Sequence, residues 1–165
     1  WLARVLVLNN VRKVIGIHRS RFLVTGAAPI SPDLVRWYMA LGVPMLEVWG
    51  QTEACGASTC MPIERIKPGL IGTAAPFNEV AVSGEGELLI RGENVFMGYL
   101  NQPSMTAETI DAESWLHTGD VGCVDADGYF EVKSLRTAAP PAAPSLADAP
   151  VHNAGALSRW ISSPR

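Results

Sequence analysis

The sequence predicts an α/β fold, in which a strand–helix–strand layer is followed by small antiparallel β elements. Three features in the first third of the chain point to the layer: a β-favouring run at 21–25, a helix start at 31–33 and a second apolar run at 44–49. Further along, two pairs of short β runs each enclose a glycine-containing turn. Strands separated by a helix favour parallel pairing, whereas strands joined by a tight turn form antiparallel hairpins.

The first half of the chain supplies the layer. Residues 1–16 alternate apolar clusters with basic side chains, which indicates an amphipathic helix. Residues 21–25 favour a buried strand, because they include aromatic and β-branched residues and are followed by a glycine. The Ser-Pro-Asp sequence at 31–33 is typical of a helix N-terminus, Gly42 predicts the end of that helix, and 44–49 form the next strand. The apolar face of the helix is predicted to consist of Leu34, Val35, Tyr38, Met39 and Leu41.

The second half is predicted to be mainly antiparallel. Residues 57–80 are rich in proline and glycine, which predicts a loop. A hairpin with strands at 79–82 and 87–91 follows, and a short helix is expected at 104–111. A second hairpin is expected at 120–132, because its Asp-Gly turn is the strongest local hairpin signal in the chain.

The last part of the chain has a different composition. Residues 133–165 hold eight alanines and five of the twelve prolines, without a sustained hydrophobic period. Such a segment cannot bury enough apolar surface to offset the entropy of ordering it, so we expect it to be disordered. We therefore divide the chain into a folded part, residues 1–132, and a tail, residues 133–165.

Composition excludes several classes of protein. The net charge is −3, so the charge favours neither nucleic acid nor an anionic membrane as a partner, and we expect no nucleic acid. No apolar run reaches the roughly 20 residues needed to cross a bilayer, so no transmembrane segment is expected. Three cysteines do not make a disulfide framework and favour a reducing cytoplasm. The chain starts at Trp1 instead of Met, and we expect it to begin inside a longer reading frame.

Two short motifs about 65 residues apart carry the clearest functional signal. The first is Glu47-Val48-Trp49-Gly50-Gln51-Thr52-Glu53, and the second is Trp115-Leu116-His117-Thr118-Gly119-Asp120. Each puts a carboxylate, Glu53 or Asp120, where a strand meets a glycine-containing turn, and such turns build nucleotide and metal sites in α/β proteins. Taken alone, Glu53 is more typical of a solvated acid at a helix start, and Asp120 is more typical of a turn or cap residue.

Five motifs in a fixed order connect the chain to a known family. They are Gly26-Ala27-Ala28-Pro29-Ile30-Ser31, the run 47–53, Gly92-Glu93-Asn94-Val95-Phe96-Met97-Gly98-Tyr99, the run 115–120 and Asp127-Gly128-Tyr129-Phe130. In this order and spacing they resemble the AMP-forming acyl-CoA synthetases of the adenylate-forming superfamily, and are most like the bacterial long-chain fatty acid–CoA ligases. The resemblance covers roughly residues 1–132.

The resemblance implies an enzyme that joins a fatty acid to coenzyme A. ATP and the acid would give an acyl-adenylate and pyrophosphate, and the thiol of coenzyme A would then displace AMP, with Mg²⁺ neutralising phosphate charge. Residues 1–132 would be part of an N-terminal AMP-binding (adenylation) domain, with a partial βαβ layer and a β-barrel-like portion. The resemblance also implies a cytoplasmic enzyme, and peripheral membrane contact stays open because its substrates are lipids.

Site residues follow from the same resemblance. Glu53 matches the Mg²⁺ ligand and Thr52 the hydroxyl at the α-phosphate, and these two are the predicted catalytic residues. Asp120 matches the acceptor of both ribose hydroxyls, and Trp49 takes the place of the usual tyrosine that stacks on adenine. The resemblance also implies a wall of small residues beside the base, formed by Gly26, Ala27 and Ala28. The remaining residues of the run 47–53 complete the predicted nucleotide site: Glu47, Val48, Gly50 and Gln51. His117 is expected to be a structural partner, and Phe96 and Tyr99 to serve packing.

The sequence also departs from the family. A Ser/Thr/Gly-rich phosphate loop with a lysine does not occur in it, and the expected Asp-Arg-x-Lys-Asp hinge is replaced by Lys133-Ser134-Leu135-Arg136-Thr137. We hypothesise a frameshift after residue 132, and expect the chain alone to be inactive and prone to aggregate through unpaired sheet edges. Two alternatives stay open: a fragment of an enzyme that activates aryl or amino acids, and a non-catalytic nucleotide-binding remnant.

Overall fold

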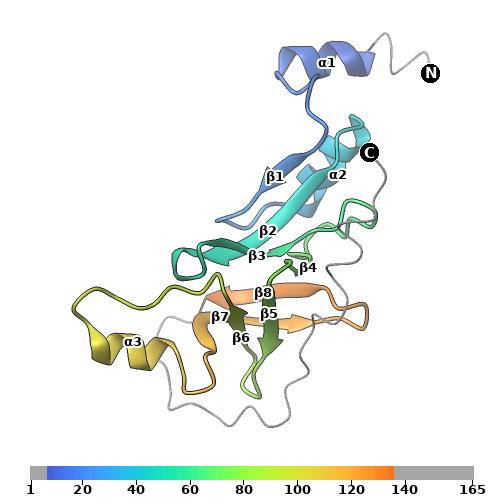
Figure 1. The fold of residues 1–165 in the computed structure, drawn as a ribbon. Helices are drawn as coiled ribbons and strands as arrows, with labels where there is room; N and C mark the ends of the chain where they lie inside the picture. The colour runs from blue at the N-terminus through green and yellow to red at the C-terminus, as the bar shows by residue number, and fades with distance from the viewer. Residues whose placement is uncertain (1–6, 136–165) are drawn as a thin grey trace.

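Residues 7–135, which the computed structural model describes, form two four-stranded sheets with short helices at their ends (Figure 1). The strand order is β1-β2-β3-β4 in the first sheet and β5-β6-β7-β8 in the second. In chain order the elements are α1 (Asn9–Val14), β1 (Leu23–Thr25), α2 (Pro32–Ala40), β2 (Met45–Gln51), the 3₁₀ turn η2 (Thr52–Ala54), β3 (Gly56–Cys60), β4 (Thr73–Ala74), β5 (Asn78–Val82), β6 (Glu87–Gly92), α3 (Pro103–Thr109), β7 (Leu116–Val124) and β8 (Phe130–Leu135).

The predicted strand–helix–strand layer is confirmed. β1 and β2 pair in parallel, with Leu23 opposite Met45, and α2 connects them. The described part of the predicted N-terminal helix is α1, whereas residues 1–6 lie outside the described residues. No side chain of α1 is buried, and Val14 is 86% exposed.

Helix α2 begins and ends where the sequence predicts. Pro32 occupies its first turn, and Gly42, at φ +81°, follows its last residues. Ser31 has the extended backbone of an N-cap, although its side chain makes no capping hydrogen bond. The predicted apolar face is only partly correct, because Val35 is fully buried while Leu34 is 44% exposed. The helix touches the sheet along a narrower stripe than its apolar pattern suggests.

The loop predicted for 57–80 is wrong in part, because β3 and β4 lie inside it. β3 consists of small residues, Gly-Ala-Ser-Thr-Cys, which carry little β propensity. It pairs with β2 so tightly that a Cβ on Gly50 would lie 1.8 Å from the carbonyl oxygen of Gly56. Ser58 and Thr59 are fully buried. Close backbone approach and burial, and not propensity, therefore make this strand.

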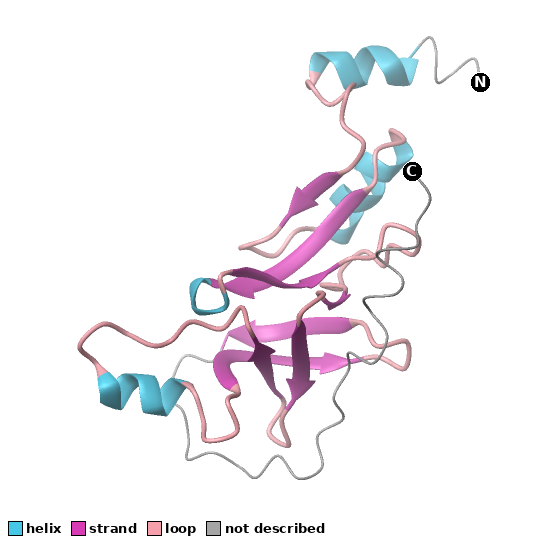
Figure 2. Cartoon of the chain, viewed as in Figure 1, coloured by secondary structure: helices cyan, strands magenta, loops and turns pink. Residues whose placement is uncertain are grey.

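The second sheet contains both predicted hairpins and curls into a half-barrel (Figure 2). β5 and β6 pair antiparallel around the glycine-rich turn, and β7 and β8 pair around the Asp-Gly turn. Register shifts interrupt the β6–β7 and β7–β8 ladders, and such bulges increase the curvature of a sheet. β8 continues to Leu135, so residues 133–135, which the composition assigns to the tail, lie in this sheet. The predicted disorder from residue 136 onward lies outside the described residues.

One hydrophobic core joins the two sheets. It combines buried side chains of the first sheet and η2 with buried side chains of the second: Trp49, Ala54, Ala74, Val80, Leu88, Ile90, Leu116 and Phe130. The backbone of Phe130 exchanges two hydrogen bonds with the loop before β4, to the oxygen of Gly72 at 2.8 Å and from the nitrogen of Ile71 at 2.9 Å. The sheets are thus connected through both side chains and backbone.

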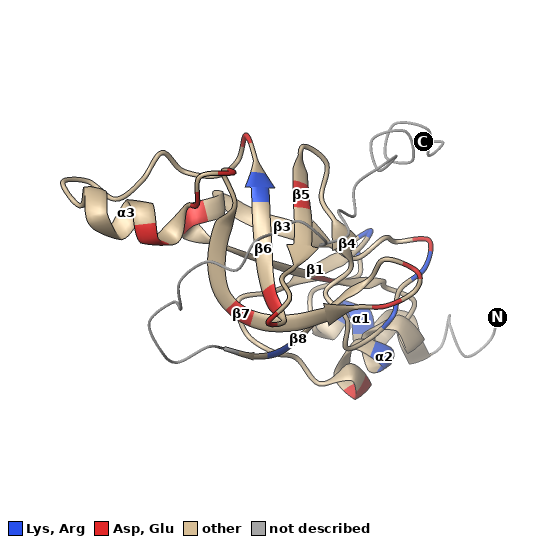
Figure 3. Cartoon of the chain, turned by 90° about the horizontal axis from the view of Figure 1, so that it is seen from below, with Lys and Arg blue, Asp and Glu red and all other residues tan. Residues whose placement is uncertain are grey.

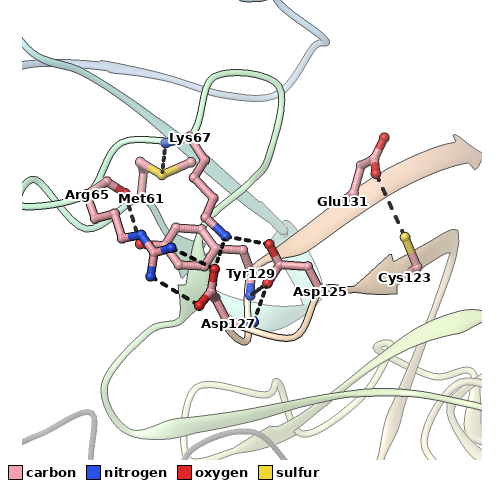
Figure 4. A network of polar contacts seen from close by, with 8 residues as sticks. All are labelled: Met61, Arg65, Lys67, Cys123, Asp125, Asp127, Tyr129 and Glu131. Atoms are coloured by element: carbon pink, nitrogen blue, oxygen red, sulfur yellow. Dashed lines mark hydrogen bonds and ion pairs between the residues drawn. The ribbon is translucent and has the colours of Figure 1, made fainter.

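An ionic cluster reinforces the same junction (Figure 4). Lys67 lies 2.6 Å from Asp125 and 2.7 Å from Asp127, and its ammonium also lies over the ring of Tyr129. Arg65 makes a two-bond contact with Asp127. The hydrogen bonds from Lys67 lower the pKa of both aspartates. The side chains of Arg65 and Asp127 are 62% and 42% exposed, whereas those of Lys67 and Asp125 are partly buried. Because solvent screens the exposed part, the cluster orients the 62–70 loop more than it stabilises the fold.

Elsewhere, acidic and basic residues are interspersed along loops, helices and strands (Figure 3). This distribution agrees with the small net charge of −3. Among residues 7–135, no helix is both long and apolar enough to cross a bilayer.

Candidate functional site

The candidate site begins at the carboxyl ends of the parallel strands β1 and β2. Residues 26–28 leave β1 there as an exposed turn, and Ala27 has a left-handed φ of 65°. Gly26 packs against β2, since an added Cβ would lie 2.8 Å from both the side chain and the carbonyl oxygen of Val48. Ligands of open α/β sheets bind at such strand ends. The structure therefore brings two predicted segments, 26–28 and 48–53, to one edge of the sheet.

The acidic turn η2 follows β2 directly. Thr52 is exposed, Glu53 is partly buried, and Ala54 is buried in the core below them. The turn ends at Cys55, whose φ of 53° is again left-handed. Non-glycine residues in this conformation cost free energy and gather at functional sites. Both turns of the candidate site, at Ala27 and at Cys55, contain one.

Segment 94–99 holds the acidic turn in place. The hydroxyl of Tyr99 donates to Oε1 of Glu53 at 2.8 Å, and the backbone nitrogen of Phe96 donates to the carbonyl of Glu53 at 2.7 Å. The side chain of Asn94 donates to the carbonyl of Ala54 at 3.0 Å. Hydrogen bonding to Glu53 is the main reason that the pKa of Tyr99 is raised. The sequence predicts packing for Tyr99, and its ring does pack against Phe96, but the hydrogen bond to Glu53 is a further role that the sequence does not reveal.

The two carboxylate motifs meet through Trp49 and Asp120. The indole nitrogen of Trp49 donates to Oδ2 of Asp120 at 2.6 Å, across 71 residues of sequence. A register shift in the β2–β3 ladder lies between Trp49 and Gly50. The Trp49 side chain packs in the core that joins the sheets, and the residue is only 9% exposed. The site is therefore built from both sheets, and stacking of Trp49 on a base stays a prediction.

A second polar network supports the strand that carries Asp120. His117 lies 3.0 Å from Glu87 and 3.5 Å from Asp111, with all three side chains 10% exposed or less. Glu87 also accepts a hydrogen bond from the backbone of Gly119 at 2.9 Å. The bond to Glu87 raises the pKa of His117, and burial opposes this effect. His117 is thus a structural partner, as the sequence indicated.

Other predicted residues lie apart from these contacts. Glu47 is buried, and its carboxylate accepts a hydrogen bond from the backbone nitrogen of Gly69 at 3.0 Å. Burial raises the pKa of Glu47. Gly50 serves the close approach of β3, and Gln51 is partly buried at the end of β2. Glu47 and Gly50 therefore have structural roles that are complete without a ligand.

The acidic turn has the chemistry of a magnesium site that depends on its substrate. Among the described residues, no group of three His, Cys, Asp or Glu side chains could hold a metal ion. Mg²⁺ is commonly bound through one or two carboxylates together with substrate phosphates and water. Glu53 is partly exposed, and the hydrogen bond of Tyr99 reaches only its Oε1. A single carboxylate of this kind fits a cation that arrives with a phosphate.

Comparison with known proteins relates the chain to AMP-binding enzymes and to fatty-acid–CoA ligases. Residues 8–100, more than half of the chain, match the family of AMP-binding enzymes. The chain is 38% identical over 128 residues to a Mycobacterium tuberculosis protein with the provisional name fatty-acid–CoA ligase fadD11, covering 77% of the chain and 22% of that protein. It is 36% identical over 136 residues to the long-chain-fatty-acid–CoA ligase ACSBG2 of Gallus gallus, covering 79% and 18%.

The fold has a similar counterpart among solved structures. The N-terminal domain of FACL13 from Mycobacterium tuberculosis superposes with a TM-score of 0.66 at 30% sequence identity. The match covers 78% of the present chain and 36% of that domain. The chain thus spans about a fifth of the length of the curated relatives and about a third of the solved domain.

Proposed function

This chain belongs to the family of AMP-binding enzymes, and from that premise we propose that it is the nucleotide-binding part of an AMP-forming long-chain fatty acid–CoA ligase. In the proposed reaction, a fatty acid carboxylate attacks the α-phosphate of ATP and releases pyrophosphate. The thiol of coenzyme A then attacks the acyl-adenylate carbonyl, and AMP leaves. A carboxylate is a poor electrophile, and adenylation gives it a good leaving group.

The contact between Trp49 and Asp120 is the observation that supports this proposal best. It joins a parallel-strand edge, where nucleotides bind in α/β proteins, to a carboxylate on the second sheet. An ionised carboxylate is an acceptor only, and so suits the two donor hydroxyls of a ribose. The small, exposed residues at 26–28 would leave room for a flat base beside the same edge.

We assign the remaining roles by chemistry. Glu53 would hold Mg²⁺, which supplies charge neutralisation at the phosphates, and the exposed hydroxyl of Thr52 would donate to the α-phosphate. Residues 26–28, Val48, Gly50 and Gln51 would border the base through backbone and small side chains. A long-chain fatty acid is the proposed substrate because a relative that covers 79% of the chain bears that name. Peripheral membrane contact would follow from a lipid substrate.

Calorimetry of the chain with AMP tests the nucleotide site. We expect AMP to bind, and Asp120→Asn to weaken binding about tenfold, because a neutral amide is a poorer acceptor for two hydroxyls. The matched control is Asp33→Asn, which changes an exposed acid paired with Arg36 on α2. Equal affinities for the two variants would contradict the assignment of Asp120. No AMP binding by the unmodified chain would contradict the nucleotide site as a whole.

The effect of Mg²⁺ on nucleotide binding distinguishes the proposed role of Glu53 from that of Asp120. Binding of ATP should strengthen when Mg²⁺ is added, and Glu53→Gln should remove that gain while leaving the affinity for AMP unchanged. A gain that persists in the variant would place the cation elsewhere. Palmitate-dependent exchange of pyrophosphate into ATP should be blank for the chain alone, because its sequence contains no phosphate loop with a lysine. Exchange above the Asp120→Asn background would overturn that expectation.

A further inference from the structure

We propose that Trp49 is a positioning residue that acts through the edge of its indole, orienting Asp120 so that the site selects a ribose over a 2′-deoxyribose. This inference rests on the proposed nucleotide site and adds a residue that determines its sugar specificity. It differs from the stacking role predicted from the sequence, because it uses the indole N–H and not the face of the ring.

The burial of Trp49 favours an edge role. The residue is 9% exposed, and its ring packs in the core that includes Ala54, Leu116 and Phe130. A ring covered in this way offers little free face to a base. Its single polar atom, the indole nitrogen, is the part that reaches the site, and it lies 2.6 Å from Oδ2 of Asp120. Buried tryptophans usually pair this nitrogen, and here the partner is a predicted ligand-binding carboxylate.

Asp120 is held from two directions. Its carboxylate accepts from Trp49, and its backbone nitrogen donates to the hydroxyl of Thr118 at 3.1 Å. Thr118 in turn donates to the carbonyl of Leu88 at 2.7 Å, which fixes it to the neighbouring strand. Within residues 7–135, the indole is the donor that we find on the carboxylate, and it occupies one oxygen. The other oxygen, Oδ1, keeps its acceptor capacity for a ligand.

The donor type matters as well as the contact. An indole N–H donates and cannot accept, so it never competes with the carboxylate for a ribose proton. Because one oxygen of Asp120 is held by the indole, the side chain is already oriented before a ribose diol binds, and binding costs less side-chain entropy. Preorganisation of this kind increases affinity and the selectivity for a diol. A ligand that lacks one hydroxyl would leave the acceptor unpaired, which is costly in a partly buried site.

The hydrogen bond itself is tested without a nucleotide. In the chain labelled with ¹⁵N at its tryptophan side chains, the Trp49 indole proton should exchange with solvent much more slowly than that of Trp37, which lies on α2 and is 46% exposed. Asp120→Ala should speed exchange at Trp49 by at least about tenfold and leave Trp37 unchanged. Unchanged exchange at Trp49 would overturn the inference, whatever the chain binds.

The sugar specificity is tested with AMP and 2′-deoxy-AMP. Trp49→Phe keeps an aromatic ring and removes the N–H, so we expect the preference for AMP to fall by about threefold to tenfold. The control Trp37→Phe should keep the preference of the unmodified chain. Far-ultraviolet circular dichroism and the urea midpoint of each variant establish that it is folded, and the proton-exchange test with Asp120→Ala, which keeps Trp49 in place, decides the inference if Trp49→Phe does not fold.

The outcomes separate this inference from the proposed function. If the unmodified chain prefers AMP and Trp49→Phe prefers it equally, the inference is wrong and the nucleotide site stands. If Trp49→Phe loses affinity for AMP and 2′-deoxy-AMP by the same factor, Trp49 acts on the base or the fold, and the inference is also wrong. If the unmodified chain binds neither nucleotide, the proposed function and the role in sugar selection both fail. Loss of preference in Trp49→Phe alone supports the inference.

Discussion

Substitution Tyr99→Phe should release Glu53 from the position in which we propose that it holds Mg²⁺. The hydroxyl of Tyr99 donates to Oε1 of Glu53 at 2.8 Å, and its ring also packs edge-on against Phe96, with ring centroids 4.8 Å apart. Phenylalanine keeps the ring contact and removes only the hydroxyl. The substitution therefore removes the hydrogen bond that links η2 to the segment before α3, together with any contact of the same hydroxyl with Thr109.

The size of the effect follows from the charge and burial of the pair. A hydrogen bond to an ionised group contributes about 1.5–3 kcal/mol to stability, and partial exposure of both side chains reduces this to about 1–2 kcal/mol. The raised pKa of Tyr99 keeps the hydroxyl protonated. Its stabilising contribution is complete below the ordinary tyrosine pKa of about 10 and is lost as the pH rises through the higher folded-state value. Measurements at pH 7 therefore report the intact bond.

A double-mutant cycle measured by urea unfolding gives the coupling directly. The cycle combines Tyr99→Phe with Glu53→Ala, since glutamine at 53 would keep an acceptor for the hydroxyl. We expect a coupling free energy of about 1–2 kcal/mol. Tyr38→Phe on α2 is the matched control, because within residues 7–135 we find no hydrogen bond of the Tyr38 hydroxyl. A coupling below about 0.3 kcal/mol would refute the view that Tyr99 holds Glu53.

Two further predictions concern the frame of the site. Gly50→Ala should cost more than about 4 kcal/mol in urea unfolding, because the new Cβ would lie 1.8 Å from the carbonyl oxygen of Gly56. Gly84→Ala, in open space, should change stability by less than about 0.5 kcal/mol, and similar losses would contradict the argument. The bond to Glu87 raises the pKa of His117, so the stability that protonated His117 adds is complete below pH 6.5 and is lost as the pH rises through its folded-state pKa. The stability difference between the unmodified chain and His117→Gln should therefore be about 1 kcal/mol larger at pH 6 than at pH 8.5, and a difference independent of pH would exclude the ion pair.

Much of the fold could be predicted because its signals are local. The helix start at 31–33, the stop at Gly42 and the Asp-Gly turn at 127–128 each specify a backbone conformation within a few residues. β3 could not be predicted, since its small residues are neither β-branched in the main nor alternating. It exists because Gly50 lets another backbone approach and because its polar side chains Ser58 and Thr59 are buried, with the hydroxyl of Thr59 donating to the carbonyl of Ile71.

The candidate site was predicted by resemblance, but its contacts were not. Motif order indicated that Glu53 and Asp120 serve one nucleotide, yet nothing local to either residue shows which side chain orients it. Tyr99 is 46 residues from Glu53, and Trp49 is 71 residues from Asp120. Spacings of this size carry no periodic information. Tyr99 and Trp49 are both aromatic residues that carry a hydrogen-bond donor. Their packing can be expected from sequence, but the acceptor of each hydrogen bond is known only from the structure.

The backbone bridge between Phe130 and the 71–72 segment also constrains the order of folding. The first sheet is encoded early, but the loop before β4 finds its hydrogen-bond partner only in β8, almost 60 residues later in the chain. During synthesis at roughly 5–20 residues per second, that loop would wait several seconds for its partner. Contacts of long sequence separation slow folding, because the loop-closure entropy is lost before they form. The amides of Ile71 and Phe130 should consequently become protected from hydrogen exchange together and late, as one cooperative unit that closes both sheets.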